Sequence, residues 1–531
     1  MMRRKIGVIV AGALLALSLS VSGCGTQKEE APQTEKAPSI AHVALYMAPV
    51  TDWDPAIAAN TENQVFLNTY ETLLKYESET DSFKPVLATE YTKSADGLVW
   101  TFKLRQGVKF HDGTDFNADA VKFSIDRTMR MKKGASYIWS VVKEIKVIDA
   151  DTVQFTLTEP APLDIIASSS QAALIYSPTA VGQDDQKGTD WFTQGNICGT
   201  GPYMLQSQVA GNGVVLTRFE DYWGGWSGNH FDKVVFKLVG ENSSRRQLIE
   251  SGEADVATNL LPDDLIALQS NPNVQVVISD AYKSVTAFLN TQKEPLKNKL
   301  VRQAIAFSFP YDGYVKYVKL GQFGSIGVDP LLPKGLWGAL DQNPYTYDLE
   351  KAKDLLEEAG YAEGELKISV TNLAGTDDRK KTLELWKSEL AKIGVTLDIQ
   401  NMQSDAMLAL ARRPNADERQ DIIVLGNWPD IISPMSYYAS QVKSSGSWSF
   451  SYFTSPEIDQ EIDAANAMSG IDRAKAEEMF QAIGKKVAEE CITINFGDDK
   501  SVMVLNKNFK GFKPNSGYES VVFMYDCYRE E

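Results

Sequence analysis

Apolar and polar residues alternate strictly along residues 98–105 (LVWTFKLR), which predicts a strand with one buried face. Two shorter alternating runs within residues 143–157 flank the polar stretch 149–151 and predict a β-hairpin. Residues 115–131 lie between these segments and carry apolar residues four positions apart, which is typical of a helix. This first region of the chain is therefore expected to be α+β.

Farther along the chain, strand patterns and helix patterns alternate. The predicted strands are residues 366–371, 395–400 and 421–425, and the predicted helices between them are residues 380–393 and 405–411. This order implies a parallel sheet with right-handed crossovers. Because ligands bind beyond the carboxyl ends of such strands, the segment after Leu425 is a candidate binding site.

Residues 348–360 have the clearest amphipathic pattern, with Asp348 placed to cap a helix and Gly360 placed to end it. Two more helices fit residues 455–468 and 472–490. The final stretch is expected to return to two short strands, residues 492–495 and 502–505.

The N-terminus has the pattern of a secretory signal. Basic residues at positions 3–5 precede an apolar run that extends to about Val21. The sequence Val-Ser-Gly-Cys that follows resembles the bacterial lipobox, which implies a signal peptide of residues 1–23 and a lipid attached to Cys24. An ordinary signal followed by a chance cysteine, or an uncleaved anchor helix, are the alternatives.

The segment after Cys24 is polar and predicts a flexible tether over residues 24–38. Roughly 490 residues remain for the folded part, which is too many for one core and implies two or three compact units. The net charge is −17, and removal of the three basic signal residues makes it −20. Such a surface repels phosphate backbones, so nucleic-acid binding is not expected.

The sequence carries few signs of catalysis or of resident metal. Its three histidines are scattered, and the motifs of zinc proteases, serine hydrolases and phosphate-binding loops are missing. Besides Cys24 the cysteines are Cys198, Cys491 and Cys527, which leaves one disulfide or buried free thiols as equal alternatives. We therefore expect a receptor without a cofactor, and not an enzyme.

Residues 100–114 (WTFKLRQGVKFHDGT) and 116–121 (FNADAV) resemble the signature of the peptide/nickel family of ABC-transporter solute-binding proteins, family 5. Further matches occur in the family's order: Tyr70–Leu73 as YETL, residues 85–88 as PVLA, 199–203 as GTGPY, 222–224 as YWG, 252–255 as GEAD, 301–304 as VRQA, 347–348 as YD, 355–361 as LLEEAGY and 428–434 as WPDIISP. The glycines of the first segment suit tight turns around a short strand, residues 108–110, and its aromatic residues suit a core. That segment therefore indicates the family and not the ligand.

The resemblance implies an α/β fold with two lobes of the periplasmic-binding-protein type (type II, class C) and an extra α+β subdomain inserted near the N-terminus. The implied boundaries are residues 39–62, 196–288 and 490–531 for lobe I, 63–195 for the insert and 289–489 for lobe II. The lobes of such receptors close around a ligand by a hinge motion.

The function that the resemblance implies is that of an extracytoplasmic, lipid-anchored receptor of an ABC importer. Such a receptor, a monomer, binds short peptides between its lobes and delivers them to a membrane permease. Other possible ligands within the family are nickel or a metallophore, an opine or a sugar. A secreted hydrolase and a signalling receptor are alternatives of different classes.

Asp430 is the first candidate for ligand binding, because peptide receptors of this family often hold the ligand's ammonium with an Asp that follows a Trp. Here Trp428 and Asp430 stand one residue closer together than in that pattern, and Asp430 also follows a predicted strand. The alternative is that Asp430 caps a local turn and that Trp428 belongs to the core. Arg412 is a candidate for binding the ligand's carboxylate, and the alternative is that it is a surface residue. Tyr137 and Trp448 are aromatic candidates for the cleft.

Overall fold

The computed structural model describes residues 37–58, 62–182, 191–209 and 212–530 of the chain. By its contacts the chain divides into two units, residues 1–38 and 39–531. The predicted signal peptide, Cys24 and nearly all of the predicted tether lie outside the described residues. Within the described ranges no helix has the length and apolar character needed to cross a membrane.

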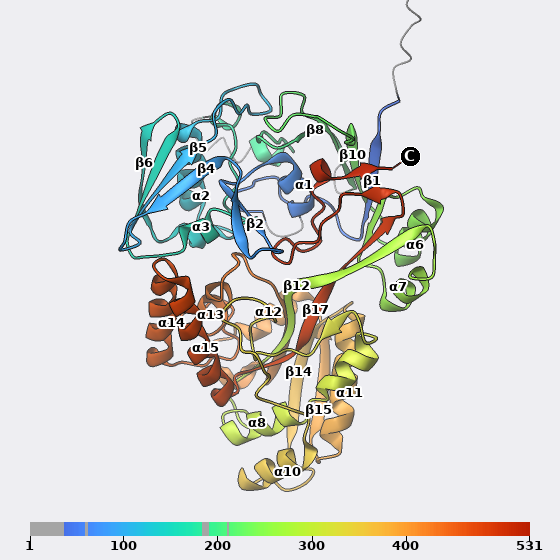
Figure 1. The fold of residues 1–531 in the computed structure, drawn as a ribbon. Helices are drawn as coiled ribbons and strands as arrows, with labels where there is room; N and C mark the ends of the chain where they lie inside the picture. The colour runs from blue at the N-terminus through green and yellow to red at the C-terminus, as the bar shows by residue number, and fades with distance from the viewer. Residues whose placement is uncertain (1–36, 59–61, 183–190, 210–211, 531) are drawn as a thin grey trace, which may run out of the picture. The chain divides into compact units, whose positions relative to one another are not determined.

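Two long strands, β12 and β17, connect the two ends of the main sheet. β12 and β17 pair antiparallel along most of their length, and Figure 1 shows them running from the region of β1 and β10 to that of β14 and β15. In the described part of the chain the sheet has eleven strands, of which β13 (Gly324–Ser325) pairs with β17 off the main path. The order along the path is β15 (Thr396–Met402), β14 (Lys367–Leu373), β16 (Ile422–Asn427), β12 (Val274–Leu289), β17 (Thr493–Asn506), β11 (Val256–Thr258), β1 (Ile40–Leu45), β10 (Lys233–Leu238), β9 (Gly213–Arg218) and β8 (Tyr203–Val209).

One end of this sheet has the predicted parallel arrangement. β14 pairs in parallel with both β15 and β16, as the alternating pattern predicted, whereas β16 pairs antiparallel with β12. Trp386 of α11 is fully buried and packs edge-on against Phe309 and Phe496. The helices in this part of the chain are α8 (Lys299–Phe307), α9 (Tyr311–Gly313), the π-helical turn Tyr314–Val318, α10 (Leu349–Glu358), α11 (Asp377–Ala391), α12 (Ser404–Ala411) and α13 (Met435–Gln441).

The other end combines parallel and antiparallel pairs. β1 lies between β10 and β11 and is parallel to both, and β9 then pairs antiparallel with β10 and β8. The helices of this part are α1 (Asn63–Thr69), α6 (Asn242–Ser251) and α7 (Pro262–Leu268). Small elements complete it: α4 (Pro178–Val181), the 3-10 turn Met524–Asp526 and the pair β18 (Phe509–Lys510) and β19 (Tyr528–Arg529).

A separate antiparallel sheet lies in the region of the predicted insert. Its order is β4 (Ala88–Lys93), β5 (Val99–Leu104), β7 (Thr152–Leu157) and β6 (Val142–Asp149). The predicted strand, helix and hairpin are confirmed here as β5, α2 (Ala118–Met131) and the pair of β6 and β7. α2 begins after Asn117, whose side chain accepts a hydrogen bond from the N–H of Ala120. The hairpin of β2 (Leu74–Glu77) and β3 (Ser82–Pro85), α3 (Leu163–Ile166) and the 3-10 turn Ser136–Trp139 adjoin this sheet in the sequence. The exact boundaries of lobes and insert stay a prediction.

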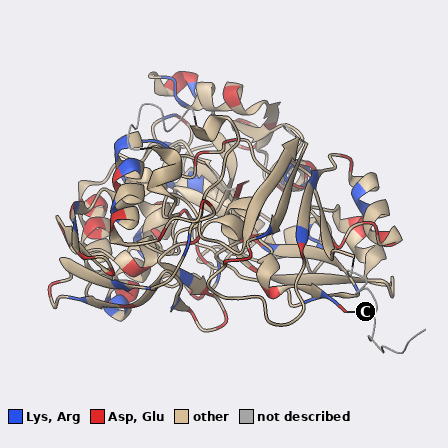
Figure 2. Cartoon of the chain, turned by 90° about the horizontal axis from the view of Figure 1, so that it is seen from above, with Lys and Arg blue, Asp and Glu red and all other residues tan. Residues whose placement is uncertain are grey.

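The cap predicted at Asp348 is present, and two later helices are capped as well. Asp348 accepts a hydrogen bond from the N–H of Lys351 at the start of α10. Ser455 and Asp472 cap α14 (Pro456–Ser469) and α15 (Arg473–Glu490) in the same way. Charged residues of both signs lie along the helices (Figure 2), and some of them form i,i+4 ion pairs such as Lys122–Asp126.

Two local predictions are wrong. The strands predicted at residues 492–495 and 502–505 are parts of one strand, β17, which begins at Thr493, because the polar residues between them continue the pairing with β12 and are in part buried. The short strand at residues 108–110 is only an isolated bridge between Lys109 and Asp115, because the turn at Gly113 reverses the chain at once. Among the described residues the three cysteines are free and buried, so the free-thiol alternative holds.

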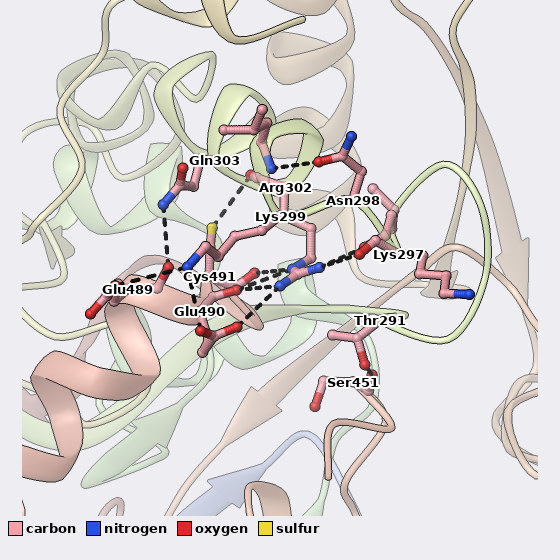
Figure 3. Close-up of polar contacts among 12 residues, drawn as sticks. Thr291, Lys297, Asn298, Lys299, Arg302, Gln303, Ser451, Glu489, Glu490 and Cys491 are labelled. Atoms are coloured by element: carbon pink, nitrogen blue, oxygen red, sulfur yellow. Dashed lines mark hydrogen bonds and ion pairs between the residues drawn. The ribbon is translucent and has the colours of Figure 1, made fainter. Parts of the chain in front are cut away.

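Arg302 of the VRQA motif has a structural role. Its guanidinium donates hydrogen bonds to the backbone oxygens of Glu490 and Cys491 at the end of α15, and to those of Leu296 and Lys297 before α8 (Figure 3). A cation at the carboxyl end of a helix satisfies carbonyls that have no partner within the helix. The motif therefore joins α8 to α15 and does not contact the candidate site described next.

Candidate functional site

A cavity of about 310 Å³ lies where several strands of the main sheet end. Three of its wall segments directly follow, or overlap, the carboxyl ends of β1, β11 and β16, as expected for ligand sites in α/β sheets. The lining residues are Leu45, Tyr46, Met47, Ala48, Asn63, Gln64, Ser170, Thr258, Asn259, Tyr282, Lys283, Trp428, Pro429, Ser516, Gly517, Tyr518, Glu519, Ser520 and Val521. Both ends of the main sheet therefore contribute to one cavity.

An irregularity in β12 places Tyr282 and Lys283 in this wall. Asp280 pairs with Lys500 and Ser284 pairs with Asp498, so residues 281–283 stand opposite Asp499 alone. Extra residues in one strand bend it and redirect its side chains.

Tyr282 holds the irregular segment in place from three sides. Its N–H donates to the backbone oxygen of Ser516 at 3.1 Å, and its backbone oxygen accepts a hydrogen bond from the hydroxyl of Tyr437 at 3.0 Å. Its hydroxyl lies 2.9 Å from that of Tyr76. The strand, the C-terminal segment and α13 therefore meet at this residue.

Lys283 and Glu519 are the charged residues among those that line the cavity. They form an ion pair of 3.0 Å, with 26% and 27% of their side-chain surfaces exposed. The negative charge of Glu519 raises the pKa of Lys283. The wall is thus electrically neutral but strongly dipolar at this point.

Gln64 is an unusual polar residue of the wall. It lies at the start of α1, is only 7% exposed, and neither its amide nitrogen nor its amide oxygen has a hydrogen-bond partner among the described residues. The neighbouring Asn63 is equally buried, but its amide donates to the hydroxyl of Ser170 at 3.0 Å. Buried amides are normally paired, so Gln64 requires an explanation.

Asp430 and Tyr137 lie in contact, although they are far apart in the sequence. The Tyr137 hydroxyl donates to the Asp430 carboxylate at 2.5 Å, and the hydroxyl of Ser169 donates to the Asp430 backbone oxygen at 2.8 Å. Burial raises the pKa of Asp430, while the hydrogen bond from Tyr137 acts in the opposite direction. Asp430 is not among the lining residues, but Trp428 and Pro429 just before it are.

The remaining predicted site residues fall into two groups. Trp428 lines the cavity and is 47% exposed, so it does not belong to the core. Arg412 lies over the ring of Trp448 at 5.8 Å, and neither residue lines the cavity. The ligand-binding role of all five predicted residues stays a prediction.

Sequence reasoning missed Gln64, Tyr282, Lys283 and Glu519. The mostly polar residues 279–284 (SDAYKS) inside a mainly apolar strand are a usable signal for the irregularity in β12. No comparable signal marks Gln64 or Glu519, because their positions depend on contacts between distant segments.

A larger cavity of about 680 Å³ between α8, α10 and α15 contains none of the predicted site residues. In the described ranges no group of three or more metal-ligating side chains is present.

Comparison with known proteins decides the family. The family model of the bacterial extracellular solute-binding proteins, family 5, matches residues 82–449. The chain belongs to this family. Its members are solute-binding proteins located outside the cytoplasm, which confirms the predicted class of protein and its predicted extracytoplasmic location, and places it apart from enzymes.

Similar proteins cover nearly the whole chain. The probable D,D-dipeptide-binding periplasmic protein DdpA of Escherichia coli K12 is 28% identical over 482 residues, 88% of this chain and 90% of that protein. The structure of the periplasmic binding protein DppA of Helicobacter pylori in complex with the peptide STSA is 26% identical with a TM-score of 0.77, and covers 93% and 98% of the two chains. NikA of Brucella suis in complex with Fe(III)-EDTA is 22% identical with a TM-score of 0.81, covers 92% and 100%, and supports the fold alone. The predicted two-lobed fold is confirmed.

Proposed function

We propose that this solute-binding protein is a lipid-anchored receptor for short peptides that delivers them to a membrane permease of an ABC importer. The observation that carries the proposal is the cavity of about 310 Å³ with walls from both ends of the main sheet. Its volume is at the lower end of the range for ligand pockets, which favours a small ligand. Its polar side chains and single ion pair suit a ligand that carries charges and amides.

Peptides are favoured over the other ligands of the family for two reasons. The relative DdpA is named as a probable D,D-dipeptide-binding protein, and the similar DppA structure holds a peptide. Direct ligation of nickel needs several His, Cys or carboxylate donors, and no such group occurs among the described residues. A chelated metal, an opine or a sugar remain the ligands against which the proposal is tested.

The proposed mechanism is closure of two lobes about β12 and β17, with the protein acting as a monomer. We assign residues 39–62, 196–288 and 490–531 to lobe I, 63–195 to the insert and 289–489 to lobe II. A ligand that contacts both lobes favours the closed state, because those contacts exist only there. Asp430 would hold the ligand's ammonium, and Trp428 and Tyr137 would contact the ligand beside it. Arg412 and Trp448, which lie together, would contact longer ligands.

A thermal-unfolding screen tests the peptide proposal. Di- to pentapeptides, opines, nickel, nickel chelates and sugars are each added to the purified protein. A true ligand at 100 times its dissociation constant stabilises the folded state by about 2.7 kcal/mol. We expect peptides to raise the unfolding temperature. A response to nickel chelates, opines or sugars with none to any peptide would reject the proposal.

The proposed anchor is the lipid on Cys24, joined to the folded receptor by residues 25–38. The substitution Cys24→Ala should release soluble protein from cells without changing peptide affinity, because the lipid and the predicted ligand-binding residues belong to separate parts of the sequence. Cell fractionation and calorimetry measure the two effects. Protein that stays in the membrane, or that is released but has lost affinity, would contradict the separation of anchor and receptor.

A further inference from the structure

We propose that Lys283 binds the free carboxylate of the ligand and that Glu519 holds Lys283 in the empty receptor. The inference rests on the proposed peptide-binding function and adds a requirement to it: the ligand must end in an unblocked carboxylate. Lys283 is the cation among the residues that line the cavity, whereas Arg412, the candidate from the sequence, lies against Trp448 elsewhere.

The position of Lys283 is fixed by the fold. It belongs to the irregular segment, residues 281–283, that interrupts the pairing of β12 with β17. Its neighbour Tyr282 is held by Ser516 and Tyr437, so the backbone that presents Lys283 is supported on both sides. A binding cation on a supported backbone loses little freedom when a ligand arrives.

The ion pair with Glu519 suits an exchange of partners. A partly buried ammonium is costly without a counter-ion, and in the structure Glu519 supplies that counter-ion to Lys283. A ligand carboxylate that takes the place of Glu519 leaves Lys283 paired throughout. Glu519 is itself 27% exposed along its side chain, so its carboxylate reaches water when it is released.

Gln64 points to the same class of ligand independently. Its side-chain amide is buried in the cavity wall, and among the residues that the structure describes neither its donor nor its acceptor has a partner. A peptide group offers one N–H and one C=O, which are the complement of a Gln side chain. A ligand with an amide beside a terminal carboxylate therefore satisfies both Gln64 and Lys283, and a short peptide with a free C-terminus has this structure.

The test uses two peptide libraries and the full chain in detergent. One library consists of tripeptides with free carboxyl termini, and the other contains the same tripeptides as C-terminal amides. Peptides retained by the immobilised protein are quantified by mass spectrometry. We expect the free acids to be retained about 10- to 100-fold better than the amides, the ratio for loss of one charged hydrogen bond.

Variants then assign the preference to Lys283. Lys283→Met should abolish it and Lys283→Arg, which keeps the charge, should preserve it. Lys500→Met is the matched control, because Lys500 forms an ion pair with Asp280 in the same strand pair but does not line the cavity. Glu519→Gln should increase retention of the free acids by removing the competing carboxylate.

The outcomes separate the inference from the function on which it rests. If neither library is retained, the peptide function itself fails, and the inference with it. If both libraries are retained equally, the peptide function stands and the role of Lys283 is overturned. If Glu519→Gln lost as much retention of the free acids as Lys283→Met, the role of Lys283 would also be overturned. Binding would then require the intact ion pair and not a Lys283 that changes partners.

Discussion

The indole N–H of Trp223 donates to both oxygens of the buried Glu71 carboxylate, at 3.1 and 2.9 Å. The hydroxyls of Thr200 and Tyr222 donate to the same carboxylate at 2.8 and 3.0 Å. These four residues come from the YETL, GTGPY and YWG motifs of the family signature. Three motifs that are far apart in the sequence therefore form one polar cluster, and their role is to join the chain segments of the fold.

This cluster predicts a dependence of stability on pH. Burial raises the pKa of Glu71 from 4.5 to about 7, so folding favours its protonated form. The folded state is thus destabilised as the pH rises from about 4.5 to about 7, by about 3 kcal/mol in total, and this cost is absent below pH 4.5. The substitution Glu71→Gln should make the free energy of unfolding less dependent on pH across this interval, as measured by urea unfolding at pH 4.5, 6 and 8.

Asp498 provides the comparison for Glu71. Burial also raises the pKa of Asp498 to about 7, and its carboxylate accepts a hydrogen bond from the N–H of Lys334. Each of the variants Glu71→Gln and Asp498→Asn should therefore remove only part of the wild-type dependence. An unchanged pH profile in Glu71→Gln would show that the buried carboxylate does not titrate in this range.

The elements that were predicted correctly are those whose pattern is local. The strand at residues 98–105 and the helix that Asp348 caps follow from periodicity and from single capping residues. The sequence pattern predicts two strands where the structure has the single strand β17. The prediction fails because the buried polar residues of β17 are paired with β12 and Lys334 and not with solvent. Such residues look like a loop until their distant partners are known.

The candidate site was predicted only in part for the same reason. The rule that ligands bind after the carboxyl ends of strands led to Trp428, which lines the cavity. It did not lead to Lys283, whose position depends on an irregularity in β12, or to Glu519, which approaches from the C-terminal segment. Arg412 was chosen by analogy with the family, and the structure places it beside Trp448 instead.

A second prediction concerns the buried ion pair of Arg127 and Asp54. Two hydrogen bonds of 2.8 and 2.6 Å join these side chains, which are 0% and 2% exposed. Arg127→Met should lower the free energy of unfolding by about 3–5 kcal/mol, because it leaves a buried carboxylate without its partner. Combining it with Asp54→Asn should recover part of the loss, as measured by urea unfolding.

The exposed ion pair on the same helix is the control for Arg127. Lys122 and Asp126 lie in α2 with 41% and 28% of their side-chain surfaces exposed. Lys122→Met should cost less than about 1 kcal/mol. A similar loss for both single variants would mean that burial does not determine the strength of the pair.

A third prediction concerns Gln64 in the absence of ligand. Gln64→Leu should increase the free energy of unfolding by about 1–3 kcal/mol, because it removes two buried polar atoms that have no partner within the described part of the chain. Asn63→Leu should do the opposite, since the Asn63 amide is hydrogen-bonded to Ser170. Urea unfolding of both variants measures this contrast. A lower stability of Gln64→Leu would indicate that the amide has a partner in solution.

The last prediction separates two roles for Asp430. If its carboxylate holds the ligand's ammonium, Asp430→Asn should weaken binding of a free-amine tripeptide by at least about tenfold. The same tripeptide with an acetylated N-terminus should bind both proteins equally, because it has no charge for Asp430 to hold. Isothermal titration calorimetry at constant ionic strength measures the four affinities.

Tyr137→Phe decides whether Asp430 acts on the ligand or only on Tyr137. The hydroxyl of Tyr137 is the donor that occupies the Asp430 carboxylate in the structure. Its removal frees that carboxylate, so Tyr137→Phe should bind the free-amine tripeptide at least as tightly as the wild type. If Tyr137→Phe and Asp430→Asn instead lose affinity equally, and for the acetylated tripeptide as well, the pair is a structural link between the two segments. In that case Asp430 is not the partner of the ammonium.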